Sequence, residues 1–575
     1  MSIGCQDSSS GIFLGEAGSG VEAAAQDLVD GLQRHPWGQT SPSVYETGRL
    51  VTLSPWLTGH AERVAYLLAT QRSDGAWGLP DDGYALVPTL SATEALLSEL
   101  SRGTLGQRAD LTQATARART TAHEQSADLV RAVDRAMEVL TERLCPSLAT
   151  LDALPDMPAI ELIAPALIER INGHLARLRS AMPPTGLARW AGAKVIPPPG
   201  LDGAFLPLVR ELLESGEKPP QKLLHALEVA GDIAVGLPQI RHEPTGTIGA
   251  SPAATAAWLG DRGPAEPSNP ARWYLETVTA LHDGPVPCGF PLTVFERGWV
   301  LAWLIRAGVR LSVPPQLVLS LTAPLGPDGT PAAAGLPADA DTTAGALYAL
   351  ALLEVPHPPD VLWTYETETH FCTWRGEDGY SPTTNAHVLE AFGQYLTKAP
   401  PQRLRGDLAE RYSKTVTKIT IWLRDQQHPD GSWTDRWHAS PFYATACCAI
   451  ALARFGGTAA ASAVDAARRW ILANQHADGS WGRWQGTAEE TAYAVQTLLL
   501  TEPEPGPRSL RAAAQGEAKL LAHVDSTDAS AANPDTEDEP PLWHDKDLYH
   551  PGAIVRAAVL SALLLIRKAP NASER

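Results

Sequence analysis

Cysteine is scarce in this chain, and long apolar runs are missing. The 575 residues contain six cysteines, and no two of them are spaced as a CxxC pair. This pattern is typical of a reduced, cytoplasmic protein and argues against a disulfide framework or a zinc knuckle. The longest apolar stretch near the end, Ala557–Ile566, is too short for a transmembrane segment, which needs about 20 apolar residues. The first residues lack a basic segment followed by an apolar core, so we expect no secretory signal.

Basic residues are also in the minority. Lys and Arg total 46 against 65 Asp and Glu, and the formal net charge is −19. A surface that binds nucleic acid or an anionic membrane needs a basic excess, so we expect neither partner. An anionic substrate would have to meet individual, locally placed Lys or Arg side chains.

Alternating strand patterns are almost absent, and Ala- and Leu-rich segments divided by 47 Gly and 48 Pro fill the chain. The sequence therefore predicts an all-α protein, and its length predicts two or more domains. Three segments share one layout, in which an amphipathic helix is followed by Gln, an Asp-Gly turn and Trp. Gly accepts the positive φ of a tight turn, while Gln and Trp can bond and cover the helix end. These repeats lie at Arg63–Gly78, Ile421–Trp433 and Arg469–Gly482, and they indicate stacked helix pairs.

Two carboxylates stand at the head of the apolar segment 344–353. Asp339 and Asp341 are followed by Thr342 and Thr343. Asp before an apolar run commonly caps a helix. A carboxyl pair in an apolar cavity is also a way of keeping one acid neutral near pH 7, ready to give up its proton. The segment alone leaves both interpretations open.

The three repeats resemble the QW motifs of terpene cyclases related to squalene–hopene cyclase, and Asp339–Thr343 resembles the DxDTT acid motif of bacterial class II cyclases. Further similar segments extend the resemblance from about residue 22 to residue 566; they are 41–49, 84–96, 251–258, 295–299, 384–390 and 543–549. The resemblance implies two (α/α) barrel domains, named β and γ, with the active cavity between them. Residues 1–45 and 296–575 would form the β domain, which carries the acid motif, and residues 46–295 the γ domain.

The resemblance implies an enzyme that cyclises a linear prenyl diphosphate by protonating its terminal alkene. Asp341 matches the general acid, and Asp339 would hydrogen-bond to it and hold its geometry. Thr342 stands where the commoner motif has a third Asp and would still form hydrogen bonds. Asn385 and His387 are candidates for positioning a water or accepting the last proton, although a buried structural role suits His387 equally.

Positive charge moves through such a substrate as its rings form. Desolvated aromatic faces stabilise a cation by roughly 1–2 kcal/mol each. The candidate aromatic side chains are Tyr348, Trp363, Trp374, Tyr443, Trp484 and Trp543, whereas the repeat residues Trp77, Trp433 and Trp481 are assigned to packing.

The diphosphate is retained in class II chemistry and needs its own contacts. Asp156–Glu161 resembles a DxxxxE element associated with Mg²⁺ in bacterial relatives, and Pro158 suits the first position of a helix. A hard cation there would take oxygen ligands, keep waters and bridge to phosphate. Carboxylates near a helix start also interact favourably with the helix dipole alone. Lys546 and Arg556 are candidate phosphate contacts, and each is equally typical of ordinary surface charge.

We expect geranylgeranyl diphosphate as substrate and a labdane-, halimane- or clerodane-type bicyclic diphosphate as product; farnesyl diphosphate, giving a drimane-type product, is the alternative. A class I terpene synthase would need a DDxxD-type segment, which the pair Asp81-Asp82 does not form. A squalene cyclase would carry more QW repeats, and a protein prenyltransferase would need a zinc site that Cys447-Cys448 does not supply. A non-catalytic helical barrel that binds an isoprenoid stays open, as does a homo-oligomer.

Overall fold

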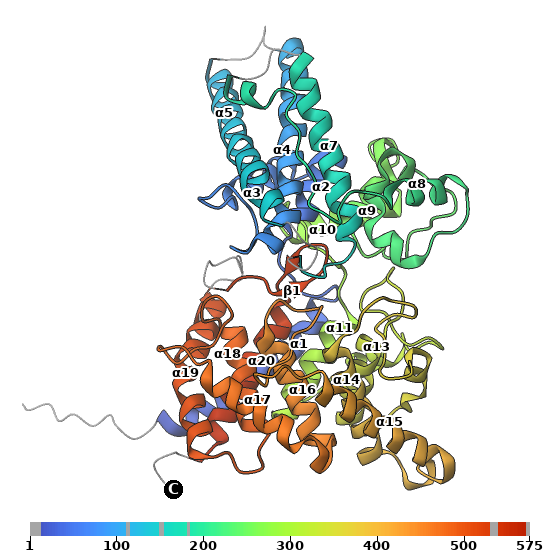
Figure 1. The fold of residues 1–575 in the computed structure, drawn as a ribbon, viewed down its shortest axis with the longest axis vertical. Helices are drawn as coiled ribbons and strands as arrows, with labels where there is room; N and C mark the ends of the chain where they lie inside the picture. The colour runs from blue at the N-terminus through green and yellow to red at the C-terminus, as the bar shows by residue number, and fades with distance from the viewer. Residues whose placement is uncertain (1–12, 111–115, 149–153, 181–184, 530–538, 571–575) are drawn as a thin grey trace, which may run out of the picture.

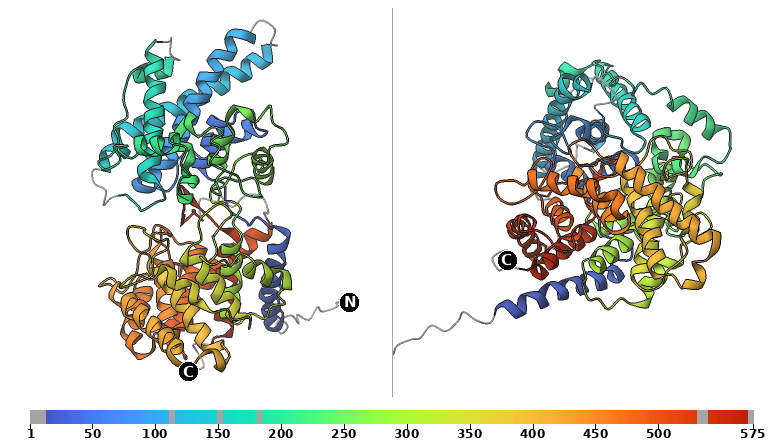
Figure 2. Two further views of the ribbon diagram at one scale, coloured as in Figure 1. Left: turned by 90° about the vertical axis from the view of Figure 1, so that its right-hand side faces the viewer. Right: turned by 60° about the horizontal axis from the view of Figure 1, so that its bottom comes forward.

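The chain folds into two helical lobes (Figure 1). The computed structural model describes residues 13–110, 116–148, 154–180, 185–529 and 539–570. Most of these residues lie in helices, so the predicted all-α class is confirmed. In the view of Figure 1, α2 to α10 form the upper lobe, and α1 together with α11 to α20 forms the lower lobe. Figure 2 shows α1 lying against the lower lobe, although the next helix along the chain belongs to the upper one.

The lower lobe is a double ring of helices. The inner ring runs through α11, α13, α14, α16, α18 and α20; each helix packs on the next, and α20 packs back on α11. The other long helices pack outside this ring. The bounds are α1 (Phe13–Arg34), α11 (Val294–Arg306), α12 (Pro315–Thr322), α13 (Ala340–Leu352), η6 (Pro359–Tyr365), α14 (Pro382–Lys398), η7 (Pro401–Arg403), α15 (Gly406–Asp425), α16 (Pro441–Phe455), η8 (Gly457–Ala460), α17 (Ala461–Ala473), α18 (Ala488–Leu500), α19 (Pro507–Ala529) and α20 (Gly552–Lys568).

The upper lobe repeats the arrangement with a smaller ring. Here α2, α4, α7, η4 and α9 pack in sequence, and α9 packs back on α2. The bounds are α2 (Val44–Leu53), α3 (His60–Ala69), α4 (Asp82–Asp110), α5 (Ala116–Val139), η1 (Leu140–Leu144), α6 (Cys145–Ser147), α7 (Ile160–Ser180), η3 (Thr185–Trp190), α8 (Leu206–Glu214), η4 (Gln221–Ala234), α9 (Pro252–Leu259), η5 (Gly260–Arg262) and α10 (Pro270–Leu281). Two closed helical rings are the barrel architecture that the sequence predicted.

The Gln, Asp-Gly and Trp repeats fasten each outer helix to the next outer helix of the same lobe. Gln71 donates from Nε2 to the carbonyls of Gly75 and Ala132, both at 2.9 Å, and Trp77 donates from Nε1 to the Leu67 carbonyl at 2.7 Å. The equivalent side chains of the other two repeats, Gln427, Trp433, Gln475 and Trp481, make the same contacts at 2.8–2.9 Å. All three indoles are fully buried. The Trp contact therefore satisfies a carbonyl left free at the end of its own helix, while the Gln contacts tie the turn to the neighbouring outer helix.

A short hairpin between the lobes was not predicted. Its strands β1 (Trp543–His544) and β2 (Leu548–Tyr549) are antiparallel, with Trp543 opposite Tyr549. Leu548 belongs to the hydrophobic core of the upper lobe, whereas Trp543 and Tyr549 belong to that of the lower lobe. Strands of two residues carry too little alternation to be recognised in a sequence.

The predicted domain boundaries, after residues 45 and 295, fall in the first turns of α2 and α11. Within the described residues, no helix has both the length and the apolar character needed to cross a membrane.

Candidate active site

A cavity of about 490 Å³ lies between the two lobes. The upper lobe contributes the segment 156–162 before and within α7 and part of η4, and the lower lobe contributes the start of α13, the loop before α16 and the hairpin. Most of the lining is apolar or aromatic, with polar groups at a few points. This is the usual construction of a site for a small apolar ligand.

Asp339 is the N-cap of α13. Its carboxylate accepts a hydrogen bond from the Thr342 backbone N–H at 2.6 Å, and 4% of the residue is exposed. Burial, reinforced by the charge of Asp341, raises the pKa of Asp339 to about 8. The side chain therefore holds a proton at neutral pH. Thr342 also lines the cavity.

Asp341, in the first turn of α13, lines the cavity. Its Oδ1 lies 2.8 Å from Nδ1 of His387, which projects from α14. Although burial lowers the pKa of His387, the negative charge of Asp341 outweighs it and raises that pKa well above the usual value. The predicted hydrogen bond between Asp339 and Asp341 is replaced by these two separate contacts. Residues two apart on a helix project in different directions, so each acid meets a different partner.

Asn385 has a structural position. It is fully buried, accepts from the Phe371 N–H and donates to the carbonyls of Phe371 and Ser381, all at 2.9–3.0 Å. It is not among the described residues that line the cavity. These three contacts occupy the Asn385 amide and anchor the segment before α14.

Lys546 and Arg556 do not reach the cavity, contrary to the prediction. Lys546 is fully buried and forms ion pairs with Glu46 at 2.5 Å and Glu228 at 2.9 Å. It also donates to the Ser251 hydroxyl at 2.7 Å and to a backbone carbonyl at 2.8 Å. Arg556 lies on α20, outside the described lining of the cavity.

Lys222 and Arg436 are the cations that line the cavity in their place. The Lys222 ammonium lies 4.6 Å from the centre of the Trp374 ring. Arg436 forms ion pairs with Asp156 at 2.7 Å and Glu377 at 3.3 Å. The sequence did not single out either residue, because Lys222 stands in the first turn of η4 and Arg436 follows a repeat by three residues. The only local signal was a basic residue next to Trp437.

Asp156 and Glu161 both line the cavity, on the side of the upper lobe. The helix that follows Asp156 begins at Ile160 rather than at Pro158, and Glu161 lies in its first turn. No cluster of three or more His, Cys, Asp or Glu side chains suited to a metal occurs in the described part of the chain. Mg²⁺ needs no such cluster, because it keeps several waters and binds through one or two carboxylates plus substrate phosphate. Asp156 and Glu161 line the same cavity as Lys222 and Arg436, so their carboxylates fit that mode of binding.

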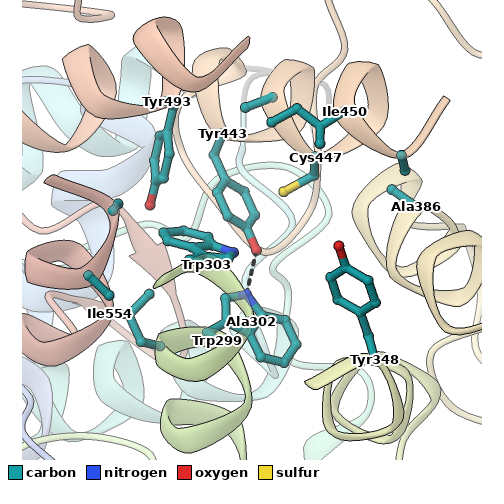
Figure 3. Packing of buried hydrophobic residues seen from close by; sticks show 14 of the residues in the cluster. Trp299, Ala302, Trp303, Tyr348, Ala386, Tyr443, Cys447, Ile450, Tyr493 and Ile554 are labelled. Carbon is teal, nitrogen blue, oxygen red and sulfur yellow. Dashed lines mark hydrogen bonds between the residues drawn. The ribbon is translucent and has the colours of Figure 1, made fainter. Parts of the chain in front are cut away.

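Some of the predicted aromatic residues reach the cavity and others do not. Trp374, Tyr443 and Trp543 line it, and the last two rings are 4.7 Å apart. Figure 3 shows Tyr443 accepting a hydrogen bond from Trp299, at 3.0 Å, while Tyr348 points into the packed core near Cys447.

Tyr348, Trp363 and Trp484 are not among the described residues that line this cavity. Trp363 stacks on Tyr412 at 5.3 Å, on the outer side of the lower ring. Trp484 meets Tyr84 edge to face at 6.0 Å, away from the described lining. Helical spacing shows that an aromatic residue is buried, but only the ring of helices decides which buried residues face the cavity.

A buried carboxylic acid at the head of a helix, facing an apolar and aromatic cavity between two helical barrels, defines a class II terpene cyclase. Residues 386–502 match the squalene-hopene cyclase C-terminal domain family. The ent-copalyl diphosphate synthase of Streptomyces sp. (strain KO-3988) is 40% identical over 558 residues, which cover 96% of this chain and 98% of that protein. The labda-7,13-dienyl diphosphate synthase of Streptomyces clavuligerus is 38% identical over 94% of this chain and 92% of that protein.

A solved structure supports the same assignment. The ent-copalyl diphosphate synthase from Streptomyces platensis superposes with a TM-score of 0.82 at 44% identity, over 95% of this chain and 99% of that chain. This chain belongs to the bacterial class II diterpene cyclases, the family that includes these copalyl diphosphate synthases.

Proposed function

We propose that this enzyme cyclises geranylgeranyl diphosphate to a bicyclic labdane-, halimane- or clerodane-type diphosphate, without releasing the diphosphate. The contact between Asp341 and His387 at the wall of an apolar cavity carries the proposal. The names of the similar proteins, which are copalyl and labdadienyl diphosphate synthases, support the product class.

Asp341 is the proposed proton donor. The π electrons of the terminal alkene form the new C–H bond, and Asp341 is left as a carboxylate. His387 holds Oδ1, so the other carboxyl oxygen is free for the proton that is transferred. The imidazolium of His387 would stabilise the carboxylate that remains once a protonated Asp341 has given up its proton. His387 is thus a positioning residue rather than the final base.

Lys222 and Arg436 are the proposed contacts of the diphosphate. They lie on the same cavity as Asp341, with Asp156 and Glu161 nearby on its upper wall. We propose that the two carboxylates hold Mg²⁺, which would neutralise part of the diphosphate charge when bound. Tyr443 and Trp543 present aromatic faces to the positive charge that develops during ring formation.

The predicted domain division belongs to this proposal. Residues 1–45 with 296–575 would be the β domain and residues 46–295 the γ domain. The support is that α1 packs on α11 and α20, whereas α2 packs on α4 and α9.

The test is a product assay with purified enzyme and Mg²⁺, in which geranylgeranyl and farnesyl diphosphate are supplied separately. Products are treated with phosphatase and identified by mass spectrometry. We expect a bicyclic C20 alcohol only after phosphatase treatment, and Asp341→Asn is expected to lower the rate at least about 100-fold. Asp425→Asn is the matched control, because Asp425 is an exposed carboxylate on α15.

The outcomes separate the alternatives. A hydrocarbon released without phosphatase would show that diphosphate is expelled, which contradicts class II chemistry. A product from farnesyl diphosphate alone would move the substrate to C15. No product from either would lead to a trial of squalene, and binding without turnover would favour an isoprenoid carrier.

A further inference from the structure

The hairpin between the lobes places a second carboxylate on the wall of the cavity. Asp545, in the turn between β1 and β2, lines the cavity, and 13% of its side chain is exposed. Its Oδ1 accepts from His225 Nε2 at 2.6 Å and from the Lys546 backbone N–H at 2.6 Å. The reaction proposed above assigns no role to Asp545.

The contacts of His225 show that this carboxylate is ionised. The Nδ1 atom of His225 lies 2.5 Å from the Gly249 carbonyl, and Nε2 faces Asp545. Both partners are acceptors, so both nitrogens must donate and the ring is an imidazolium. Burial raises the pKa of Asp545, but the adjacent imidazolium and the hydrogen bonds outweigh it and hold that pKa below its usual range.

The second oxygen of Asp545 is left open, and a glycine preserves the space beside it. Gly289 also lines the cavity and has φ +59°, and a Cβ on it would lie 2.7 Å from Oδ2 of Asp545. Any side chain at position 289 would therefore crowd this oxygen. Asp341, Asp545 and Tyr549 line the same cavity, so both carboxylates face the space that the substrate would occupy.

Three other titratable groups on the cavity wall are less suited to accept a proton. His544 is neutral, because burial lowers its pKa to about 3, but its nitrogens are occupied by the Arg436 carbonyl at 2.7 Å and by the Tyr84 hydroxyl at 3.1 Å. Asp339 already holds a proton, and Asp156 is paired with Arg436. Asp545 combines a charge, an open oxygen and access to the cavity.

We propose that the carboxylate of Asp545 is the base that ends the cyclisation, with His225 as the residue that positions it. This inference rests on the proposed cyclisation and adds its last step. A C–H bond next to the cationic carbon breaks, its electron pair becomes the new C=C bond, and the proton passes to Oδ2 of Asp545. The carboxyl is then neutral and returns its proton to water after the product leaves. Asp341 gives one proton and Asp545 takes one, so the reaction is an isomerisation; Asp341 regains its proton from water before the next turnover.

The test is the product distribution of Asp545→Asn from geranylgeranyl diphosphate. The Asn oxygen still accepts from His225 and from the Lys546 N–H, but it cannot take the proton. We expect kcat to fall about 100-fold. Among the products formed, the share of alcohols captured by water and of rearranged alkenes should rise at least about tenfold. Asp545→Glu restores a carboxylate and should recover part of the original product.

Two further variants separate the base from a structural role. Asp547→Asn changes a buried carboxylate of the same hairpin that bonds Ser43 and Tyr45 and lies outside the described lining of the cavity, so its product distribution should match the wild type. Gly289→Ala leaves every charge in place but crowds Oδ2, and it should shift products as Asp545→Asn does. Gly289→Ala also tests the role of Asp545 as the base if Asp545→Asn does not fold.

An unchanged product distribution in both Asp545→Asn and Gly289→Ala would overturn the proposal. So would a complete loss of substrate consumption in folded Asp545→Asn, because the base acts only after protonation. If the wild-type enzyme forms no cyclic product, the proposed function has failed instead, and that result is distinct from either outcome.

Discussion

Replacing Lys546 by methionine is expected to destabilise the fold rather than to weaken substrate binding. The ammonium is fully buried and has four acceptors within 2.5–2.9 Å: Glu46, Glu228, Ser251 and the His225 carbonyl. Methionine keeps most of the volume but leaves two buried carboxylates without a cation. Removing one partner of a buried ion pair typically costs about 3–5 kcal/mol.

The size of the effect follows from the position of the lysine. Glu46 and Glu228 belong to the upper lobe, whereas Lys546 comes from the hairpin that also packs on the lower lobe. A loss of about 4 kcal/mol corresponds to a fall of about 10 °C in the melting temperature for a unit of roughly 250 residues. Adding Glu46→Gln should recover part of the loss, because one of the two uncompensated charges is removed.

The assay is thermal unfolding followed by circular dichroism, together with steady-state kinetics on the folded fraction. Lys222→Met is the matched control, since Lys222 lines the cavity and lies over Trp374. That variant should keep the melting temperature within about 1 °C, because exposed charges contribute little to stability, and should raise KM for the diphosphate substrate. If instead Lys546→Met melts normally and raises KM, Lys546 contacts the phosphate and the structural role is refuted.

Three further predictions concern pH, the aromatic wall and the metal. Burial raises the pKa of Glu296 to about 8. The side chain therefore loses its proton near pH 4.5 in the unfolded chain but only near pH 8 in the folded chain. Its contribution to the stability of the fold is complete below pH 4.5 and is lost as the pH rises to 8. Glu296→Gln, which can still accept from the Gln39 N–H, should therefore gain stability over the wild type across that window, by on the order of 4 kcal/mol at most in chemical denaturation; a constant difference at all pH values would contradict this. Trp543→Ala should lower kcat by roughly 5–30-fold through the loss of one aromatic face, whereas Trp363→Phe should change it less than twofold, and equal effects of both would refute the assignment of the cavity wall. Glu161→Gln should raise the Mg²⁺ concentration needed for half-maximal substrate binding in calorimetry about tenfold, and an unchanged requirement would exclude Glu161 as a ligand.

Local features of this protein were predictable from its sequence. The three repeats reveal their turns, because Gly75 and its equivalents need a positive φ, each Gln bonds a carbonyl of its own turn, and each Trp bonds one of the helix just before it. The apolar segment after Asp341 is long enough to indicate a buried helix. The acid motif and the repeats together led to the correct class of enzyme, since both are short patterns whose chemistry depends on neighbouring residues.

The partners of charged and aromatic residues were not predictable in this way. Lys546 meets Glu46, 500 positions earlier in the chain, and the same lysine on a surface would look identical in the sequence. His387 was a candidate base until α13 and α14 brought it beside Asp341.

The amino-acid sequence by itself determined the helices, the joints between them and the position of the acid motif, because these follow from spacing along a few turns of chain. Tertiary structure alone decided which charged side chains face the cavity and which are paired with other charges inside the fold. The physical reason is that the state of a buried charge is set by partners within a few ångströms, and closing two helical rings brings together residues that lie hundreds of positions apart.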